Sequence, residues 1–307
     1  MQIGLYGLGR MGANMVRRLV RSGEHRVVAG NRSPEPVDEA ISEGAEGAYS
    51  MEEMVEKLSP PRVIWTMVPA GDVTEQTLLK FAGMMDEGDI LIDGGNSYFR
   101  DTIRRAEMLR ERGLRFLDAG TSGGIWGLQV GYCLMVGGDR EAYEHVEPAL
   151  KTLAPEDGYA YTGGAGAGHF VKMVHNGVEY AMLQAYAEGF EIMQKSQYDL
   201  DLRAVSHLWN QGSVVRSWLL ELAERAFERD ADLSSIRGYV EDSGEGRWTV
   251  LEAINEDVPA HAIAGSLFAR FASRQDDSFA MKVIAALRGE FGGHAIQEAA
   301  TKYPEQR

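Results

Sequence analysis

Four polar residues that could transfer protons lie within one short run of the chain. The run places an amine, an imidazole, an amide and a carboxyl group at steps of three, one and three residues, as Lys172, His175, Asn176 and Glu179. Steps of three or four return to the same side of an α-helix. Residues at such steps more often form a solvated face joined by weak ion pairs. The apolar residues around them, and a nucleotide-binding pattern elsewhere in the chain, favour general acid–base catalysis instead.

The spacing also limits what the amine and the carboxyl group could do. Lys172 and Glu179 are two helical turns apart, or about 10 Å at 1.5 Å per residue. This separation argues against a direct ion pair and allows two proton transfers at different atoms of one extended substrate. A base must be a neutral amine, so the pKa of Lys172 would have to fall from its usual value of about 10.4 through burial or neighbouring cations. No cluster of His, Cys and carboxylates has metal-ligand spacing, so we expect no metal site.

The elements that would position these groups fall into two halves. Residues 1–163 alternate apolar strand-like runs with amphipathic helices, which is typical of a doubly wound, mostly parallel sheet. The strands are predicted at residues 2–6, 26–29, 63–68, 90–93, 116–119 and 133–136, with helices at 11–22 and 102–112. Strands that follow closely on one another late in this half indicate mixed orientation. We therefore predict an α/β Rossmann-type dinucleotide-binding domain at residues 1–163.

The second half is predicted to be an all-α domain at residues 164–307, with the stretch 159–168 as the boundary. Its helices are predicted at residues 170–196, 202–209, 214–229, 249–255, 261–272 and 278–288.

A glycine-rich run near the N-terminus predicts a dinucleotide site. Its G-x-G-x-x-G pattern consists of Gly7, Leu8, Gly9, Arg10, Met11 and Gly12. The run follows a predicted strand and opens a predicted helix, as the dinucleotide fingerprint requires. The first glycine permits the tight turn, the second lets the pyrophosphate approach, and the third lets helix and strand pack closely. The helix N-terminus then offers free N–H groups to the phosphates.

The end of the second strand bears on the choice between NAD and NADP. An acidic residue there would bind the ribose 2′-hydroxyl of NAD, but Asn31, Arg32 and Ser33 occupy the position. Arg32 could bind a 2′-phosphate, or it could be a solvated loop cation. These residues by themselves therefore favour NADP, or the use of both NAD and NADP, as the cofactor.

Composition excludes several classes of protein. The 307 residues are 44% hydrophobic and 25% charged, with a net charge of −15 that disfavours nucleic-acid or anionic-membrane binding. No apolar run reaches the roughly 18 residues of a membrane-spanning helix, and no signal peptide is evident. The single cysteine, Cys133, lies in an apolar stretch where we expect it to be buried. We expect a cytoplasmic protein without disulfides.

The sequence resembles the decarboxylating 6-phosphogluconate dehydrogenases, specifically a short type within the β-hydroxyacid dehydrogenase superfamily. The matching blocks are residues 7–14, 93–97, 121–124, 166–180 and 288–294. The block at 166–180 is the most specific, because the wider superfamily shares its lysine but not the whole His-Asn-Gly-x-Glu-Tyr run. The resemblance implies oxidation and decarboxylation of 6-phosphogluconate to ribulose 5-phosphate in the pentose phosphate pathway.

The resemblance also implies roles for individual residues. Lys172 would be the base at the C3 hydroxyl, and Glu179 the acid that protonates C1. Side chains and backbone that would hold the sugar acid and the nicotinamide are Asn96, Ser122, Gly123, Gly124, His175 and Asn176, and Val68 would contact the cofactor. Tyr180 and Arg270 would bind the phosphate. Arg288 and His294 would reach substrate in a neighbouring subunit, which implies a homodimer or a higher homo-oligomer.

Departures from the family pattern leave some points open. NADP-specific members carry a lysine shortly after the Asn-Arg pair, where this chain has residues 34–37 without a cation, and short members often use NAD. The resemblance therefore slightly favours NAD. Ser243, Arg247 or Arg216 could contact the substrate, and the sequence does not decide between them. A non-decarboxylating β-hydroxyacid dehydrogenase, such as one for 3-hydroxyisobutyrate, and a dinucleotide-sensing regulator without turnover are the alternatives.

Overall fold

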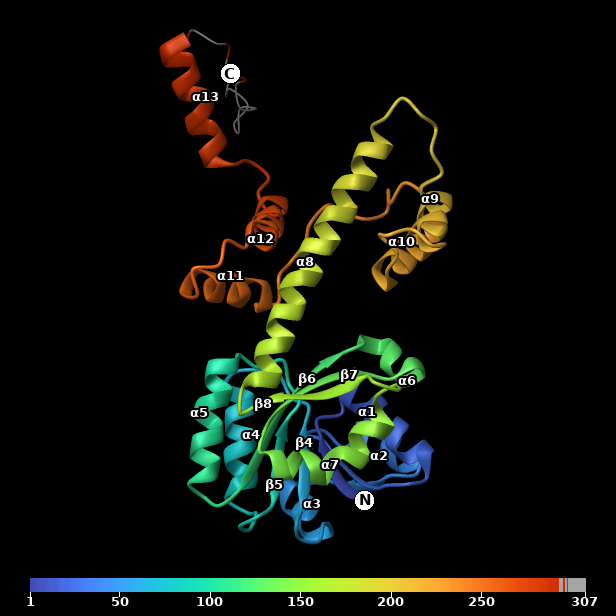
Figure 1. Cartoon of the computed structure of the whole chain (residues 1–307), viewed down its shortest axis with the longest axis vertical. Helices are drawn as coiled ribbons and strands as arrows, with labels where there is room; N and C mark the ends of the chain where they lie inside the picture. Colours follow the sequence, from blue (N-terminus) through green and yellow to red (C-terminus); the bar gives the residue numbers. More distant parts are fainter. Residues whose placement is uncertain (293–294, 296, 298–307) are drawn as a thin grey trace, which may run out of the picture. The chain divides into compact units, whose positions relative to one another are not determined.

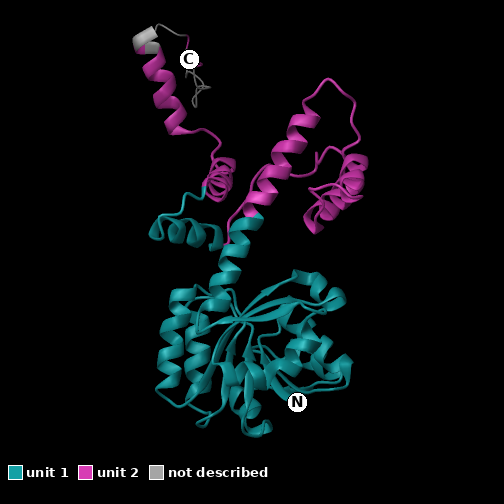
Figure 2. Ribbon diagram, in the orientation of Figure 1, with its two compact units in different colours: residues 1–179, 244–260 teal, residues 180–243, 261–307 magenta. Residues whose placement is uncertain are grey.

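The computed structural model describes residues 1–292, 295 and 297, and its chain divides into two compact units (Figure 2). The first unit comprises Met1–Glu179 and Gly244–Ala260, and the second comprises Tyr180–Ser243 and His261–Arg307. The predicted boundary at residue 163 falls within the first unit, because the helix that begins at Ala167 starts in close contact with the sheet.

An eight-stranded sheet forms the centre of the first unit (Figure 1). The strands are β1 (Gln2–Tyr6), β2 (Arg26–Gly30), β3 (Glu46–Ala48), β4 (Val63–Thr66), β5 (Ile90–Asp93), β6 (Arg115–Ser122), β7 (Cys133–Gly138) and β8 (Tyr159–Gly163). Their order is β3-β2-β1-β4-β5-β6-β7-β8, and only the β6–β7 pair is antiparallel. The predicted Rossmann-type α/β fold and the mixed orientation of its later strands are confirmed.

Two strands were not expected from the sequence. β3 has only three residues, one of them a glycine, so it lacks a readable alternation. β8 lies in the stretch 159–168 that was predicted as the domain boundary, and it pairs with β7 in parallel at the edge of the sheet. Its proximity to a glycine-rich run made it resemble a linker.

Helices cover both faces of the sheet. They are α1 (Arg10–Ser22), α2 (Glu35–Ser42), α3 (Met51–Lys57), α4 (Asp72–Ala82), α5 (Phe99–Arg110), α6 (Gly127–Val130) and α7 (Arg140–Leu153). Alternate strand residues enter opposite cores: Val63 and Trp65 pack with α1, α2 and α7, whereas Ile64 packs with α3, α4 and α5. Both faces are therefore buried, which explains why the central strands read as continuous apolar runs.

The remaining helices follow the sheet in sequence. They are α8 (Ala167–Gln194), α9 (Leu202–Asn210), α10 (Trp218–Arg229), α11 (Glu245–Asn255), α12 (His261–Ser273) and α13 (Phe279–Gly292). α11 and the first part of α8 belong to the first unit, and the described residues after β8 contain no strand. The helix expected from residue 214 is wrong at its start, because Ser217 caps α10 by accepting a hydrogen bond from the Leu220 N–H at 3.1 Å.

Candidate active site

The glycine turn between β1 and α1 has the geometry of a phosphate-binding site. Gly7 has φ 102°, and a Cβ there would lie 2.5 Å from the Met67 carbonyl oxygen. A Cβ on Gly12 would lie 2.0 Å from the Gly7 carbonyl oxygen, so neither position accepts a side chain. Gly9, in contrast, faces open space immediately before α1, whose first turn has no acidic residue. The exposed helix N-terminus fits a dinucleotide pyrophosphate.

The end of β2 supports this turn through Asn31. The Leu8 N–H donates to Asn31 Oδ1 at 3.0 Å, and Asn31 Nδ2 donates to Ser33 Oγ at 3.0 Å. Arg32 is exposed and has no hydrogen bond or ion pair with the residues that the structure describes. The first turn of α2, just beyond it, carries the acidic residues Glu35 and Asp38. The amide of Asn31 therefore fixes the turn and leaves Arg32 free to meet a ligand.

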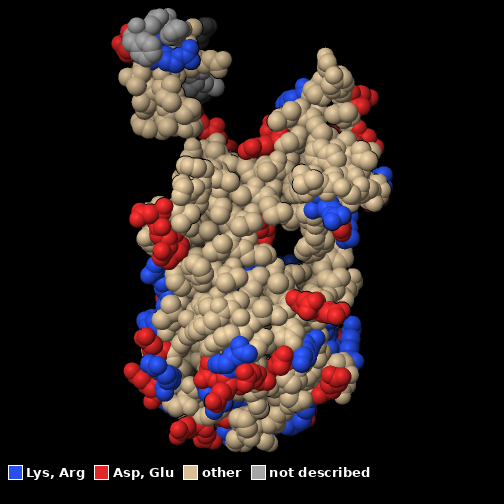
Figure 3. All heavy atoms as spheres, in the orientation of Figure 1, with Lys and Arg blue, Asp and Glu red and all other residues tan. Residues whose placement is uncertain are grey.

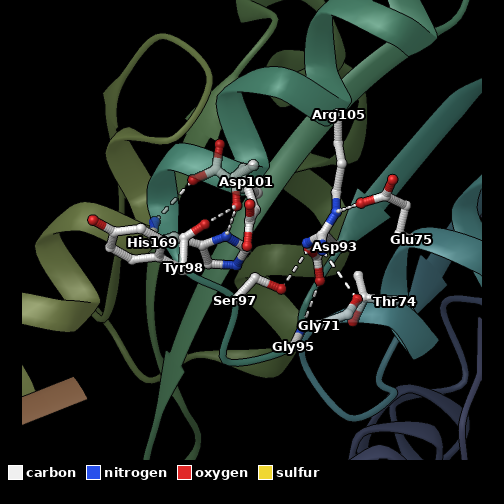
Figure 4. A network of polar contacts seen from close by, with 12 residues as sticks. Gly71, Thr74, Glu75, Asp93, Gly95, Ser97, Tyr98, Asp101, Arg105 and His169 are labelled. Carbon is white, nitrogen blue, oxygen red and sulfur yellow. Dashed lines mark hydrogen bonds and ion pairs between the residues drawn. The ribbon is translucent and has the colours of Figure 1, made fainter. Parts of the chain in front are cut away.

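The loop after β5 is held by a buried carboxylate (Figure 4). Asp93 is fully buried and accepts hydrogen bonds from the Gly95 N–H at 3.0 Å and from Ser97 Oγ at 2.7 Å. Behind it, Arg105 places a guanidinium nitrogen 3.7 Å from Asp93 and donates to the Gly71 carbonyl at 3.0 Å. Asn96 is exposed at the tip of this fixed loop.

The other residues expected to bind the cofactor border these two loops. Val68 follows β4 and is half-buried, and its carbonyl oxygen would lie 3.0 Å from a Cβ on Gly95. Arg10 is exposed in the first turn of α1, and Met11 beside it is half-buried. The carboxyl ends of β1, β2, β4 and β5 thus carry all the predicted cofactor residues, as expected at the ligand-binding edge of such a sheet.

The start of α8 is anchored to the sheet by Asp118 of β6. Its two carboxylate oxygens accept from the Gly166 and His169 N–H groups, each at 2.8 Å. Burial raises the pKa of Asp118, and His169 and these backbone donors oppose that shift. The His169 ring in turn lies 2.8 Å from Thr102 Oγ1 of α5. No pattern in the sequence indicated these contacts, because Asp118 lies within an ordinary apolar strand.

Glycines let the helix approach the sheet closely enough to position the lysine. A Cβ on Gly168 would lie 2.4 Å from the Met135 carbonyl oxygen, and one on Gly120 would lie 2.4 Å from Lys172 Cβ. Lys172 is therefore pressed against β6 one turn after the Asp118 anchor.

Replacing Asp118 with asparagine is expected to destabilise the fold by about 1–3 kcal/mol, because an amide can accept only one of the two backbone hydrogen bonds and presents an N–H to the other donor. Chemical denaturation would measure the loss. Asp139 caps α7 at the surface with a single hydrogen bond, so Asp139→Asn is the control that should cost less. Equal stability of the Asp118→Asn and wild-type proteins would contradict this anchor.

Lys172 has the environment that a catalytic base requires. It is only 8% exposed and has no hydrogen bond or ion pair with the described residues. Burial lowers the pKa of Lys172, while the nearby charges of Glu179, Glu245 and Cys133 oppose the shift. The expectation that Cys133 is buried is wrong, because its side chain, at the start of β7, is exposed.

A chain of polar side chains runs past Lys172. Ser122 Oγ lies 3.4 Å from His175 Nε2, His175 Nδ1 lies 2.9 Å from Asn176 Oδ1, and Asn176 Nδ2 donates to Glu245 Oε1 at 3.2 Å. Gly123 and Gly124 follow Ser122 with φ values of 131° and 52°. A Cβ on Gly124 would meet no atom within 4 Å, so its backbone is accessible. Glu245 was not expected here, although it lies only two residues before Arg247, which the sequence offers as a candidate substrate contact.

The two residues predicted to bind the phosphate, Tyr180 and Arg270, lie together in the second unit. Tyr180 is buried, its hydroxyl accepts from the Ser243 N–H at 3.2 Å, and the Arg270 guanidinium stacks on its ring at 3.4 Å. Arg216 is exposed in the loop before α10, and Arg288 is exposed on α13. Arg247 is exposed on α11 in the first unit, and His294 lies outside the described residues.

No group of three or more His, Cys, Asp and Glu residues among those that the structure describes could hold a metal ion. None of the helices in the described part of the chain is long and apolar enough to span a membrane. On the face shown in Figure 3, acidic and basic side chains are interspersed over the first unit, so the acidic excess is not concentrated there in one patch.

Comparisons with known proteins agree with this geometry along the whole chain. The NAD binding domain of 6-phosphogluconate dehydrogenase matches residues 2–163, and the C-terminal domain of 6-phosphogluconate dehydrogenase matches residues 168–302. A decarboxylating, NAD(+)-dependent 6-phosphogluconate dehydrogenase of Haloferax volcanii is 46% identical over 298 residues, which cover 96% of this chain and 98% of the relative.

Solved structures show the same relationship. Plasmodium falciparum 6-phosphogluconate dehydrogenase superposes with a TM-score of 0.82 at 28% identity, over 100% of this chain and 67% of the other. Mycobacterium tuberculosis 3-hydroxyisobutyrate dehydrogenase has a TM-score of 0.71 at 23% identity, over 94% of this chain and 99% of the other, and so shares the fold. Both halves of the sequence and the site geometry lead to one conclusion: the chain belongs to the 6-phosphogluconate dehydrogenase family.

Proposed function

We propose that the chain catalyses the oxidative decarboxylation of 6-phosphogluconate to ribulose 5-phosphate and CO2, with NAD or NADP as the hydride acceptor. The observation that carries this proposal is the buried amine of Lys172, whose pKa is lowered by burial, beside the polar chain Ser122–His175–Asn176. The glycine turn at α1 and the Asp93-held loop fit the dinucleotide, which supplies a ring that accepts hydride from C3 of the substrate.

The proton transfers follow from the positions of two groups. Neutral Lys172 accepts the C3 hydroxyl proton as the hydride leaves, which makes C3 a ketone. Protonated Lys172 then donates toward the C3 oxygen while the bond to the carboxylate breaks and CO2 departs. Glu179, two turns further along α8, donates a proton to C1 of the resulting enediol, which is the former C2 of the substrate. Lys172, neutral again, takes up the proton of the adjacent enediol hydroxyl, which becomes the ketone of ribulose 5-phosphate. The ketone itself accepts the electron pair, so these steps require no metal.

The remaining residues hold the substrate. Ser122, Asn176 and the backbone of residues 123 and 124 present hydrogen-bonding groups near Lys172, which suits a sugar acid with a carboxylate and several hydroxyls. Tyr180 and Arg270 bind its phosphate in the proposal, since their stacked arrangement leaves the guanidinium with donors to spare.

A homodimer completes the proposed site through Arg288 and His294 of the neighbouring chain. Several large apolar side chains of α12 and α13 are exposed and support this association, because an interface would remove them from water. Phe268 is 58% exposed, Phe279 79% and Leu287 56%. The part of α12 and α13 visible in Figure 3 also carries few charged side chains.

NAD is the favoured cofactor in this proposal. The acidic first turn of α2 lies just beyond Arg32, and its Glu35 and Asp38 would oppose a 2′-phosphate. Arg32→Ala is expected to weaken NADP binding by roughly 10-fold, in the range of one charge-assisted hydrogen bond, and to leave NAD binding nearly unchanged. Titration of both cofactors measures this, with the exposed Arg21→Ala as the control. Equal losses for NAD and NADP would show that Arg32 does not contact the 2′-phosphate.

One experiment tests the main proposal. Initial rates with 6-phosphogluconate would be measured in parallel with NAD and NADP, by nicotinamide absorbance and by CO2 release. Equal amounts of reduced cofactor and CO2 are expected. Reduction without CO2 would indicate a non-decarboxylating β-hydroxyacid dehydrogenase, and cofactor binding without any reduction would indicate a regulator.

A further inference from the structure

Glu245 is a buried carboxyl group to which the proposed mechanism gives no role. It is 2% exposed, and one of its oxygens, Oε2, has no hydrogen-bond partner among the described residues. The other oxygen accepts from Asn176 Nδ2 at 3.2 Å. Burying a carboxylate oxygen without a hydrogen-bond partner reduces the stability of the fold, so we expect a functional reason for the placement of Glu245 here.

The helix that carries Glu245 is fixed against α8. Thr249 Oγ1 donates to the Met173 carbonyl at 2.8 Å, and a Cβ on Gly177 would lie 2.6 Å from Thr249 Cγ2. Two turns further along the same side of α11, Glu252 forms an ion pair with Arg100 at 2.8 Å. Glu245 is the first residue of α11, where the free N–H groups of the helix favour a negative charge.

The Glu245 carboxyl group determines which groups donate and which accept along the hydrogen bonds from Asn176 through His175 to Ser122. A carboxylate only accepts hydrogen bonds, so it must face the NH2 of Asn176, and the amide oxygen then faces His175. That oxygen accepts only from a protonated Nδ1, which leaves His175 Nε2 as the acceptor on the side of Ser122. Without Glu245, the Asn176 amide could rotate by 180° and reverse the arrangement.

We propose that Glu245 is a positioning residue of the active site, which locks Asn176 and His175 into the one hydrogen-bonding arrangement that receives the sugar acid. This inference rests on the proposed function. The negative charge of Glu245 also acts on Lys172, as do the charges of Glu179 on α8 and Cys133 on β7. These charges oppose the lowering of the Lys172 pKa by burial.

The first test reads the free protein and needs no turnover. In protein labelled with 15N-histidine, the NMR signals of the His175 ring nitrogens are assigned by their disappearance in His175→Gln. Their chemical shifts should show the Nδ1–H tautomer in the wild type. Glu245→Met removes the acceptor at similar length and should yield a mixture of tautomers. Glu252→Met is the matched control on the same helix and should leave His175 unchanged. An Nε2–H tautomer in the wild type, or no change in Glu245→Met, would overturn the proposal.

The second test uses turnover of 6-phosphogluconate. Glu245→Met should lower kcat/KM by about 10- to 100-fold, in the range of one lost hydrogen bond to a charged group. Glu245→Gln keeps an acceptor and should recover most of the activity. Both variants lose a negative charge near Lys172, so its pKa should fall and the rising limb of kcat/KM against pH should move to lower pH. Glu252→Met should not move that limb.

The outcomes separate the two proposals. A wild-type protein that shows the Nδ1–H tautomer but no turnover would reject the proposed function and not the role of Glu245. Conversely, a wild-type level of turnover in Glu245→Met, with an unmoved pH profile, would reject the role of Glu245 and leave the proposed function intact. Thermal unfolding of both methionine variants checks that each is folded at the assay temperature.

Discussion

Lys172→Met is expected to lower the rate of cofactor reduction with 6-phosphogluconate by at least about 10²–10⁴-fold, the usual contribution of one positioned acid–base group. Methionine is similar in length and apolar, so it preserves the packing of this buried position against Gly120 of β6. It has no proton acceptor of comparable basicity, so the C3 hydroxyl cannot be deprotonated as the hydride leaves. Cofactor affinity should be retained, because the glycine turn at α1 is unchanged.

Stopped-flow absorbance and a cofactor titration measure these two quantities separately. Lys195→Met, at an exposed lysine just after the end of α8, is the control and should react like the wild type. Turnover near the wild-type level in Lys172→Met would remove the base assignment. The wild-type rate of the hydride step should rise with pH, since only the neutral amine is active, and burial lowers the pKa at which this form appears.

Glu179→Gln is expected to slow ribulose 5-phosphate formation by about 10²–10⁴-fold and to leave cofactor binding almost unchanged. The glutamine has nearly the same shape but cannot donate a proton to C1 of the enediol. The hydride step precedes this protonation, so a first burst of reduced cofactor should persist in Glu179→Gln and be absent from Lys172→Met. This difference distinguishes the acid from the base on the same helix.

Rapid mixing detects the burst, and chromatography of the products measures the ketose. Glu191→Gln, an exposed position on the same helix, serves as the control. Loss of the burst in Glu179→Gln would mean that Glu179 acts before decarboxylation. Unchanged ketose formation would reject its role as the acid altogether.

Local patterns in the sequence were sufficient for the fold class and for the parts of the site that lie within one segment. The alternation of strands and helices, the turn at Gly7, Gly9 and Gly12, and the spacing of Lys172 and Glu179 all depend on neighbours along the chain. The main departures had local causes as well: β8 follows no clear alternation beside its glycines, and residues 214–217 read as helix although Ser217 caps the helix after them.

Only the tertiary structure brought distant residues to the same place. Ser122 and His175 are 53 residues apart in the chain, and Asn176 and Glu245 are 69 apart. The Asp118 anchor under α8 and the isolated oxygen of Glu245 likewise come from packing that no periodicity encodes. The sequence by itself therefore determined which chemical groups this protein has and which elements carry them. Folding decided their burial, their partners and their pKa values, because these depend on which surfaces exclude water together.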